Sequence, residues 1–173
     1  MKYILAIDQG TSSSKAVLFD EELYQVAVAQ EEFAQIYPKP GWVEHDPRDI
    51  ILSTMGAIEK VVSDARISYR EIAAIGITNQ RETVVAWDSV TDQPLYNAIV
   101  WQDRRTADRC REIEESHGEL IRRKTGLKPD PYFSATQMEW LLENVPVVRE
   151  AARKGRLSFG TIDSWLILNL TRE

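Results

Sequence analysis

The chain has 173 residues, of which 43% are hydrophobic and 28% charged, and its 21 basic and 27 acidic residues give a formal net charge of −6. This composition is typical of a folded domain rather than a disordered chain, and the acidic balance disfavours sequence-independent nucleic-acid binding, which needs a Lys/Arg cluster. The single cysteine, Cys110, excludes a disulfide framework, and the two histidines have no metal-binding spacing. The apolar runs are far shorter than the roughly 18 residues of a membrane-spanning helix, so we expect a soluble, cytoplasmic protein with no membrane span.

The first third of the chain predicts three strands joined by two close turns. Residues 3–7 form a short, almost wholly apolar run, which is typical of a strand buried on both faces. Residues 10–14, Gly-Thr-Ser-Ser-Ser, have the composition of a turn. Residues 16–19 are apolar again, and residues 24–30 alternate as a half-buried strand does. We therefore expect a strand meander here.

A helix and a second group of strands follow. Asp46 is the expected N-cap, and Pro47 suits the first helical position because it needs no N–H partner there. Apolar residues then recur at helical spacing, at Ile51, Met55, Ile58 and Val62. Residues 72–78 and 83–87 are apolar and β-branched, so they are predicted strands on either side of a polar bend, and residues 96–100 are a further candidate.

The second half predicts mainly helices. Residues 104–115 are highly charged and indicate a surface helix, and residues 120–125 indicate a short helix that ends at Gly126. Ser134 is the expected N-cap of a helix over residues 136–143. The remaining elements are a helix at 146–154, a strand at 157–159 and a final helix at 161–170. Strands followed by helices around a mixed sheet predict an α/β fold.

The segment Asp-Gln-Gly-Thr-Ser-Ser-Ser-Lys at residues 8–15 has the parts of a phosphate-binding turn. A glycine lets the backbone approach an anion, hydroxyl side chains add donors to the backbone N–H groups, and Lys15 adds positive charge. Asp8 supplies a carboxylate of the kind that holds hydrated Mg²⁺. A plain hairpin with a Gly- and Ser-rich turn is the alternative, because the Walker and Rossmann glycine patterns are both absent.

Three later segments supply candidates for a polyol pocket. Arg81 and Glu82 lie between two predicted strands, where a strand end or bulge can turn both toward one cleft, as a fork of donors beside an acceptor. Trp101 can wall a carbon chain, and the Tyr132 hydroxyl can reach a ligand. The alternatives are an ion pair at an exposed hairpin end, a core tryptophan and a packed loop tyrosine.

Long motifs then decide between these interpretations. Asp-x-Gly-Thr-Ser in a strand-turn-strand is similar to the first phosphate motif of the actin, Hsp70 and sugar-kinase superfamily. The segments GITNQRET, NAIVWQDRRTA, DPYFSATQMEWLLENVP and FGTIDSWLILNLT, in this order, resemble the FGGY carbohydrate kinases, in particular the glycerol kinase branch. The resemblance covers nearly the whole chain.

This resemblance implies a ribonuclease-H-like (actin-like ATPase) domain, with a mixed sheet and flanking helices, and ATP bound between two such domains. It implies a reaction that transfers the γ-phosphoryl group of ATP to glycerol, giving glycerol 3-phosphate in glycerol catabolism. By the same resemblance, Arg81, Glu82 and Tyr132 match glycerol-binding positions, and Trp101 matches an aromatic wall.

The resemblance also assigns roles to the phosphate turn. Thr11, Ser12 and Ser13 match residues that contact the phosphates of ATP, and Asp8 matches an aspartate that associates with Mg²⁺ through water. Lys15 falls where many family members carry arginine. It keeps the positive charge but loses the planar fork of donors, which alters how this position would hold a nucleotide.

By the resemblance, residues 1–173 are an incomplete, C-terminally truncated N-terminal domain that holds the polyol half of the site. The family's catalytic aspartate and its adenine-binding second domain lie beyond Glu173, so we expect the isolated chain to be inactive without the rest of the kinase. The final helix then lacks its usual neighbours, which predicts exposed apolar surface on Trp165, Leu166 and Leu170, with marginal stability or self-association. The alternatives are a non-catalytic polyol-binding or partner-binding module, a kinase of another polyol or sugar, and a filament-forming relative of actin.

Overall fold

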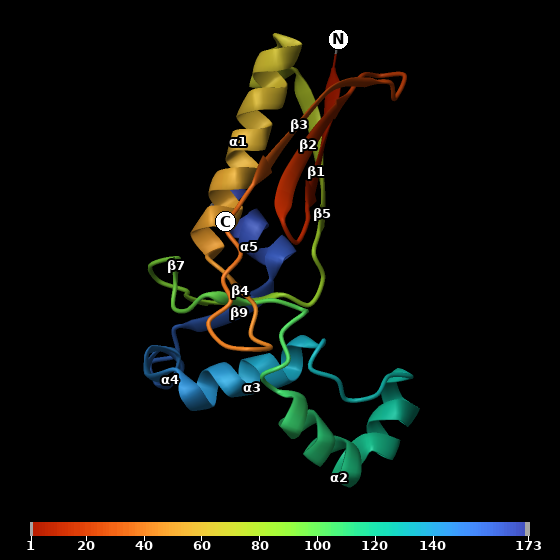
Figure 1. The fold of residues 1–173 in the computed structure, drawn as a ribbon. Coiled ribbons are helices and arrows are strands. Elements are labelled where there is room, and N and C mark those ends of the chain that lie inside the picture. The colour runs from red at the N-terminus through yellow and green to blue at the C-terminus, as the bar shows by residue number, and fades with distance from the viewer. Residues whose placement is uncertain (1, 172–173) are drawn as a thin grey trace. The chain divides into compact units, whose positions relative to one another are not determined.

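A computed structural model describes residues 2–171 of the chain. Its contacts divide these residues into two units, the first comprising residues 2–35, 46–80 and 162–171 and the second residues 36–45 and 81–161. Each unit has its own sheet with helices packed against it (Figure 1), which confirms the predicted α/β class. No helix in this described part is long and apolar enough to cross a membrane.

The first unit is built on a four-stranded mixed sheet in the order β3-β2-β1-β5. The predicted antiparallel meander is confirmed as β1 (Tyr3–Gln9), β2 (Ser13–Phe19) and β3 (Gln25–Glu32). A short 3-10 helix, η1 (Tyr69–Glu71), leads into β5 (Ile72–Asn79), which pairs with β1 in parallel.

One face of this sheet carries the core of the unit, and the opposite face stays open within the described residues. Leu5 and Ile7 of β1 are each 1% exposed, whereas Ile4, which points to the opposite face, is 39% exposed. The prediction of a first strand buried on both faces is therefore wrong for this chain. Val26 and Val28 of β3 are 44% and 47% exposed, so the open face is apolar on more than one strand.

α1 (Pro47–Ala65) packs along the buried face of the sheet (Figure 1). Its predicted start is confirmed, because the Asp46 carboxylate accepts a hydrogen bond from the Arg48 N–H at 2.8 Å and proline follows as the first residue. The buried side of the helix comprises Ile50, Ser53, Thr54, Ala57, Ile58, Val61 and Val62. Met55, one of the apolar residues at helical spacing, is 37% exposed, because the buried face of the helix is rotated from that stripe.

α5 (Ile162–Thr171) belongs to the first unit and buries its apolar stripe there. Trp165 and Leu166 are 2% and 0% exposed, and Trp165 Nε1 donates to the Pro47 carbonyl at 2.9 Å. Leu170 packs against the core of the sheet. The expected exposure of Trp165, Leu166 and Leu170 is therefore wrong, although Ile167 on the same helix is 49% exposed. Open apolar surface lies instead on the free face of the sheet.

The second unit has a sheet in the order β4-β8-β6-β7, with β9 paired to β6 and every pair antiparallel. Its strands are β4 (Glu44–His45), β6 (Val84–Asp88), β7 (Gln93–Pro94), β8 (Ala98–Ile99) and β9 (Leu157–Thr161). Its helices are α2 (Ala107–Thr125), α3 (Ser134–Asn144) and α4 (Pro146–Arg153). The core between the sheet and α3 and α4 comprises Val84, Ala86, Ile99, Leu141, Val145 and Val148.

α2 is one helix of 19 residues, where the sequence predicted two shorter ones. Gly118 lies inside it without breaking it, and a Cβ at that position would stand 2.7 Å from the Glu114 carboxylate. The predicted end at Gly126 is confirmed, since this residue adopts the left-handed conformation, with φ of 75°, that glycine accommodates without strain.

A buried ion cluster braces the second unit. The Arg105 side chain is fully buried and donates to Asp103 and Glu44, with its Nη2 2.8 Å from an oxygen of each carboxylate. The guanidinium lies over the rings of Trp42 and Trp140, at 3.9 and 4.6 Å from their centroids. Burial opposes the charged form of Arg105, but its hydrogen bonds to Asp103 and Glu44 outweigh that effect and raise its pKa.

Candidate functional site

The predicted phosphate turn is the hairpin between β1 and β2 in the first unit. The Gly10 N–H donates to the Ser13 carbonyl at 2.8 Å, which closes the turn. A Cβ on Gly10 would lie 3.2 Å from that same carbonyl oxygen, which is tighter than most Cβ contacts. Glycine is therefore favoured at position 10, because the Ser13 backbone comes so close that a side chain would be crowded.

The hydroxyl side chains of this turn fall into two groups. Ser12 is exposed and Thr11 and Ser13 are partly buried, so the three residues predicted to contact phosphate are accessible within their unit. Ser14 is fully buried instead, where its hydroxyl bonds to Ser53 Oγ at 2.8 Å and accepts from Thr54 Oγ1 at 3.1 Å. The fourth hydroxyl thus fastens β2 to α1 and is not available as a phosphate donor.

Asp8 and Lys15 are direct cross-strand neighbours on β1 and β2. Asp8 is exposed and Lys15 is partly buried, on the sheet face opposite the core. No group of three His, Cys, Asp or Glu side chains that could hold a metal occurs among residues 2–171. A lone carboxylate still fits Mg²⁺, because this ion commonly keeps several waters and takes its other ligands from substrate phosphates.

Two glutamines that the sequence analysis did not identify, Gln9 and Gln80, form hydrogen bonds to the turn. Gln9 is fully buried, and its Nε2 donates to the Gly10 carbonyl at 2.7 Å. The Gln80 side chain donates to Gln9 Oε1 at 3.1 Å and to the Gly10 carbonyl at 3.3 Å. The two Gln80 bonds tie the residue after β5 to the turn across 71 and 70 positions of the chain, which is beyond the reach of a local pattern.

The predicted polyol residues Arg81 and Glu82 lie in the bend between β5 and β6, within the second unit. Glu82 has φ of 67°, a left-handed conformation that costs a non-glycine residue of order 1–3 kcal/mol and commonly marks a functional position. Ser134 holds it there, since its hydroxyl lies 2.8 Å from the Glu82 carbonyl oxygen and 3.1 Å from Glu82 Oε2. The Ser134 N–H also donates to Oε2 at 3.3 Å.

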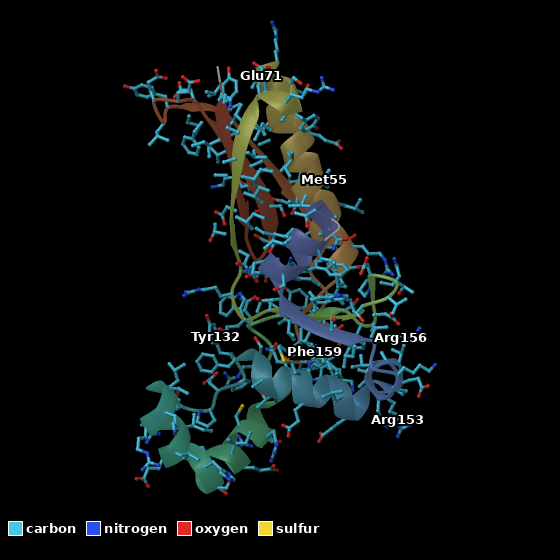
Figure 2. All side chains as sticks on the ribbon, turned by 180° about the vertical axis from the view of Figure 1, so that it is seen from behind. Met55, Glu71, Tyr132, Arg153, Arg156 and Phe159 are labelled. Atoms are coloured by element: carbon cyan, nitrogen blue, oxygen red, sulfur yellow. The ribbon has the colours of Figure 1, made fainter. Side chains whose placement is uncertain are left out.

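Trp101 and Tyr132 come together in the same unit. Their rings meet edge to face, with centroids 5.9 Å apart, and Tyr132 also packs at 5.1 Å on Phe133. The Trp101 N–H donates to Thr83 Oγ1 at 3.2 Å, which links the tryptophan to the bend that carries Glu82. Figure 2 shows Tyr132 immediately before the first turn of α3.

The structure thus joins three of the four predicted polyol residues through a chain of contacts. Glu82, Trp101 and Tyr132 combine an acceptor carboxylate, an apolar wall and a phenol, which is the set of groups that a small polyhydric alcohol requires. Arg81, the fourth predicted residue, is exposed and makes no ion pair within 4 Å in the described part of the chain.

The sequence of this chain was compared with protein families and with curated proteins. The N-terminal domain of the FGGY family of carbohydrate kinases matches residues 3–173. A glycerol kinase from Xanthomonas campestris pv. campestris (strain 8004) is 58% identical over 171 residues, which are 98% of this chain and 34% of that protein. A glycerol kinase from Chromobacterium violaceum shows the same identity over the same shares of each chain.

Solved structures agree with the sequence comparison. A glycerol kinase from Plasmodium falciparum, crystallised with ADP, superposes with a TM-score of 0.91 at 39% identity, over 99% of this chain and 35% of its own. A xylulose kinase from Lactobacillus acidophilus superposes with a TM-score of 0.80 at 26% identity, over 98% and 33%. The chain spans about a third of the length of these relatives. Sequence and structure together place the chain in the FGGY family of carbohydrate kinases.

Proposed function

We propose that this chain supplies the polyol-binding and phosphate-binding portion of a glycerol kinase that acts in the cytoplasm. The reaction transfers the γ-phosphoryl group of ATP to a terminal hydroxyl of glycerol and gives glycerol 3-phosphate. The observation that carries the proposal is a set of contacts within the second unit. Ser134 holds the left-handed Glu82, the Trp101 N–H bonds Thr83 Oγ1 in the next position, and the Trp101 ring packs on Tyr132. High identity to glycerol kinases supports the choice of polyol.

Each polyol residue has a distinct task in this proposal. The Glu82 carboxylate accepts hydrogen bonds from glycerol hydroxyls, and the Arg81 guanidinium donates to their oxygens. The Trp101 ring covers the carbon chain, and the Tyr132 hydroxyl fixes its orientation. Such positioning matters because phosphoryl transfer depends mainly on alignment and charge neutralisation.

In the phosphate turn, Thr11, Ser12 and Ser13 donate to ATP phosphates, and Lys15 neutralises part of their charge. Asp8 holds Mg²⁺ through water, consistent with its exposed position at the end of β1. The bound ion would neutralise charge on the phosphate oxygens as the phosphoryl group moves.

The base that accepts the glycerol proton is assigned to the part of the relatives that this chain does not span. Asp103 is committed to the buried ion cluster with Arg105. The Asp130 side chain accepts the Tyr132 N–H at 2.9 Å, and Asp163 lies in the first turn of α5 in the other unit. The remaining polypeptide, including the adenine-binding domain, is therefore a required partner in this proposal.

A chimaera tests the proposal directly. Residues 3–171 would replace the matching segment of the Chromobacterium violaceum glycerol kinase, and ATP-dependent phosphorylation of glycerol and of D-xylulose would be measured. We expect glycerol to be preferred, Arg81→Ala to reduce kcat/KM for glycerol, and Arg70→Ala on η1 to leave it unchanged. A folded chimaera that is inactive on glycerol, or that prefers xylulose, would refute the proposal.

The isolated chain distinguishes the second candidate function, a polyol-binding module without catalysis. Titration calorimetry with glycerol should show weak or no binding if the chain needs the rest of the kinase. Tight binding that Arg81→Ala abolishes would instead favour the module. A charged hydrogen bond contributes about 1.5–3 kcal/mol, so its loss would be easy to detect.

A further inference from the structure

α3 begins beside the polyol cluster, and its first turn contacts every segment that carries a predicted polyol residue. Ser134 is the first residue of this helix, and Gln137 lies three positions later, on the same side of the helix. The sequence predicted Ser134 as an N-cap, but Phe133 occupies that position without a side-chain bond. Both Ser134 and Gln137 instead direct their polar atoms away from their own helix.

Ser134 fixes both the backbone and the side chain of Glu82. Its hydroxyl has one hydrogen, which it can give to the Glu82 carbonyl at 2.8 Å or to Glu82 Oε2 at 3.1 Å. Its N–H, at the positive end of α3, donates to the same carboxylate oxygen at 3.3 Å. The left-handed backbone of Glu82 and the direction of its carboxylate therefore depend on the same neighbour.

Gln137 fixes the two aromatic segments. It is fully buried, and its Nε2 donates to the Val100 carbonyl at 3.4 Å and to the Pro131 carbonyl at 3.1 Å. These carbonyls belong to the peptide groups that precede Trp101 and Tyr132. Since a peptide group is planar, holding its oxygen restricts the orientation of the following N–H as well.

Both peptide groups are also held on their opposite side. The Trp101 N–H donates to Thr83 Oγ1 at 3.2 Å, and the Tyr132 N–H donates to Asp130 Oδ1 at 2.9 Å. Each of these peptide planes thus has a Gln137 bond at its oxygen and another side chain at its nitrogen. The Val100 oxygen also accepts from the Asp103 N–H at 2.8 Å. The backbone that carries each ring is therefore held in place on both sides of the peptide group.

The amide of Gln137 also carries a cost that packing alone would avoid. Its Oε1 is buried without a hydrogen-bond partner among the described residues. A buried polar atom left unsatisfied is unfavourable, and an apolar side chain of similar shape would remove that penalty. The two hydrogen bonds that Nε2 donates to the Val100 and Pro131 carbonyls offset this cost. We take this as an indication that the amide is needed to hold the segments that carry Trp101 and Tyr132.

We infer that Ser134 and Gln137 are positioning residues for polyol phosphorylation, with Ser134 aiming the Glu82 carboxylate and Gln137 fixing the Trp101–Tyr132 pair. The inference rests on the proposed function, because it gives these residues a role in polyol selection. Neither residue is required to touch the polyol. One turn of α3 sets the spacing between the acceptor and the aromatic wall.

Kinetics of the chimaera test this inference, with two variants and two matched controls. Ser134→Ala removes the hydroxyl, and its control Ser116→Ala removes an exposed hydroxyl that bonds a carbonyl within α2. Gln137→Met removes the amide at similar volume, and its control Asn144→Leu removes an exposed amide that donates to a carbonyl within α3. Ser134→Thr retains the hydroxyl and should restore the wild-type values.

Ser134→Ala and Gln137→Met should each raise KM for glycerol about tenfold, while KM for ATP stays unchanged. The preference for glycerol over propane-1,2-diol, which lacks one hydroxyl, should narrow with Ser134→Ala. A merely structural role would lower the fraction of active enzyme and the melting temperature, without changing either KM or this preference. The inference is overturned if both variants keep KM within about twofold of their controls.

Failure of the inference can be separated from failure of the proposed function. An unmodified chimaera that is folded but does not phosphorylate glycerol refutes the function. In that case hydrogen exchange on the 173-residue chain still tests the anchoring. Gln137→Met should speed exchange at the amides of residues 100–102 and 132–133 relative to Asn144→Leu, and equal exchange would overturn the positioning role.

Discussion

Replacing Arg105 with methionine should strongly destabilise the second unit. The substitution leaves the Glu44 and Asp103 carboxylates, whose side chains are 3% and 1% exposed, without their shared cation. An uncompensated buried charge of this kind costs about 3–5 kcal/mol. Since folded domains are stable by only about 5–15 kcal/mol, the loss is a large fraction of the total.

This energy corresponds to a large shift in the melting temperature. One kcal/mol lowers the melting temperature of a domain of 150–250 residues by about 2–4 °C, so the variant should melt about 6–20 °C lower. Near-ultraviolet circular dichroism should report the transition well, because the Arg105 guanidinium lies over the rings of Trp42 and Trp140, which also contact each other. Urea titration at constant temperature would give the free energy itself.

Arg109 provides the matched control on the surface of the same unit. Its hydrogen bonds to Glu139 and Glu112 raise its pKa, as those of Arg105 do. The Arg109 side chain is 48% exposed, however, so water screens these pairs and Arg109→Met should change the stability little. If Arg105→Met proved no more destabilising than Arg109→Met, burial would not be what makes the ion cluster important.

Three further predictions concern pH, association and the phosphate turn. Burial lowers the pKa of His45 from 6.5 to about 4, so stability should be full above pH 6.5 and fall by about 3 kcal/mol as the pH drops towards 4, because the unfolded chain takes up the proton first. The urea midpoint should therefore change less with pH in His45→Gln than in the unmodified chain, whereas His117→Gln, at an exposed position of α2, should behave like the unmodified chain. If the midpoints of the unmodified chain and both variants changed with pH in the same way, this prediction would be contradicted. The isolated chain should associate through the open sheet face, and Val28→Lys should reduce that association in sedimentation velocity; an unchanged profile would assign it to another surface. Gln80→Leu should speed hydrogen exchange in residues 8–13, because Gln9 Oε1 loses its hydrogen-bond donor. Unaltered exchange would mean that the turn is stable without the Gln80 side chain.

Local patterns predicted the elements whose signals lie within a few residues. The meander of β1 to β3 followed from apolar runs and a Gly-Ser turn, and the start of α1 followed from Asp46 and Pro47. The single helix α2 was predicted as two helices, at residues 104–115 and 120–125, although the helix continues through the residues between them. The burial of Trp165 was missed because its partner, the Pro47 carbonyl, lies 118 positions away.

In the candidate site, too, local motifs predicted the individual residues, whereas the contacts between them could not be predicted. Long motifs pointed to Arg81, Glu82, Trp101 and Tyr132 one by one, and spacing alone left each with an ordinary structural alternative. What joins them is non-local. Gln137 lies 37 positions from Val100, and its two acceptors are backbone carbonyls, which every residue possesses. No residue type in the sequence marks such an acceptor, so the organising role of α3 becomes visible only in three dimensions.

Ser134 shows why the same residue supports two different interpretations. A serine at the start of a helix commonly accepts a hydrogen bond from the N–H groups of the first turn, and that pattern predicts a cap. The same hydroxyl can instead donate, and here it meets a carboxylate and a carbonyl of Glu82. The deciding feature is the left-handed backbone of Glu82, an unfavourable conformation that persists only where neighbours stabilise it. The strained backbone of Glu82 therefore points to Ser134 as the residue that stabilises it. Under the positioning role inferred above, a substitution at Ser134 changes which polyol the enzyme prefers, although Ser134 itself need not contact the polyol.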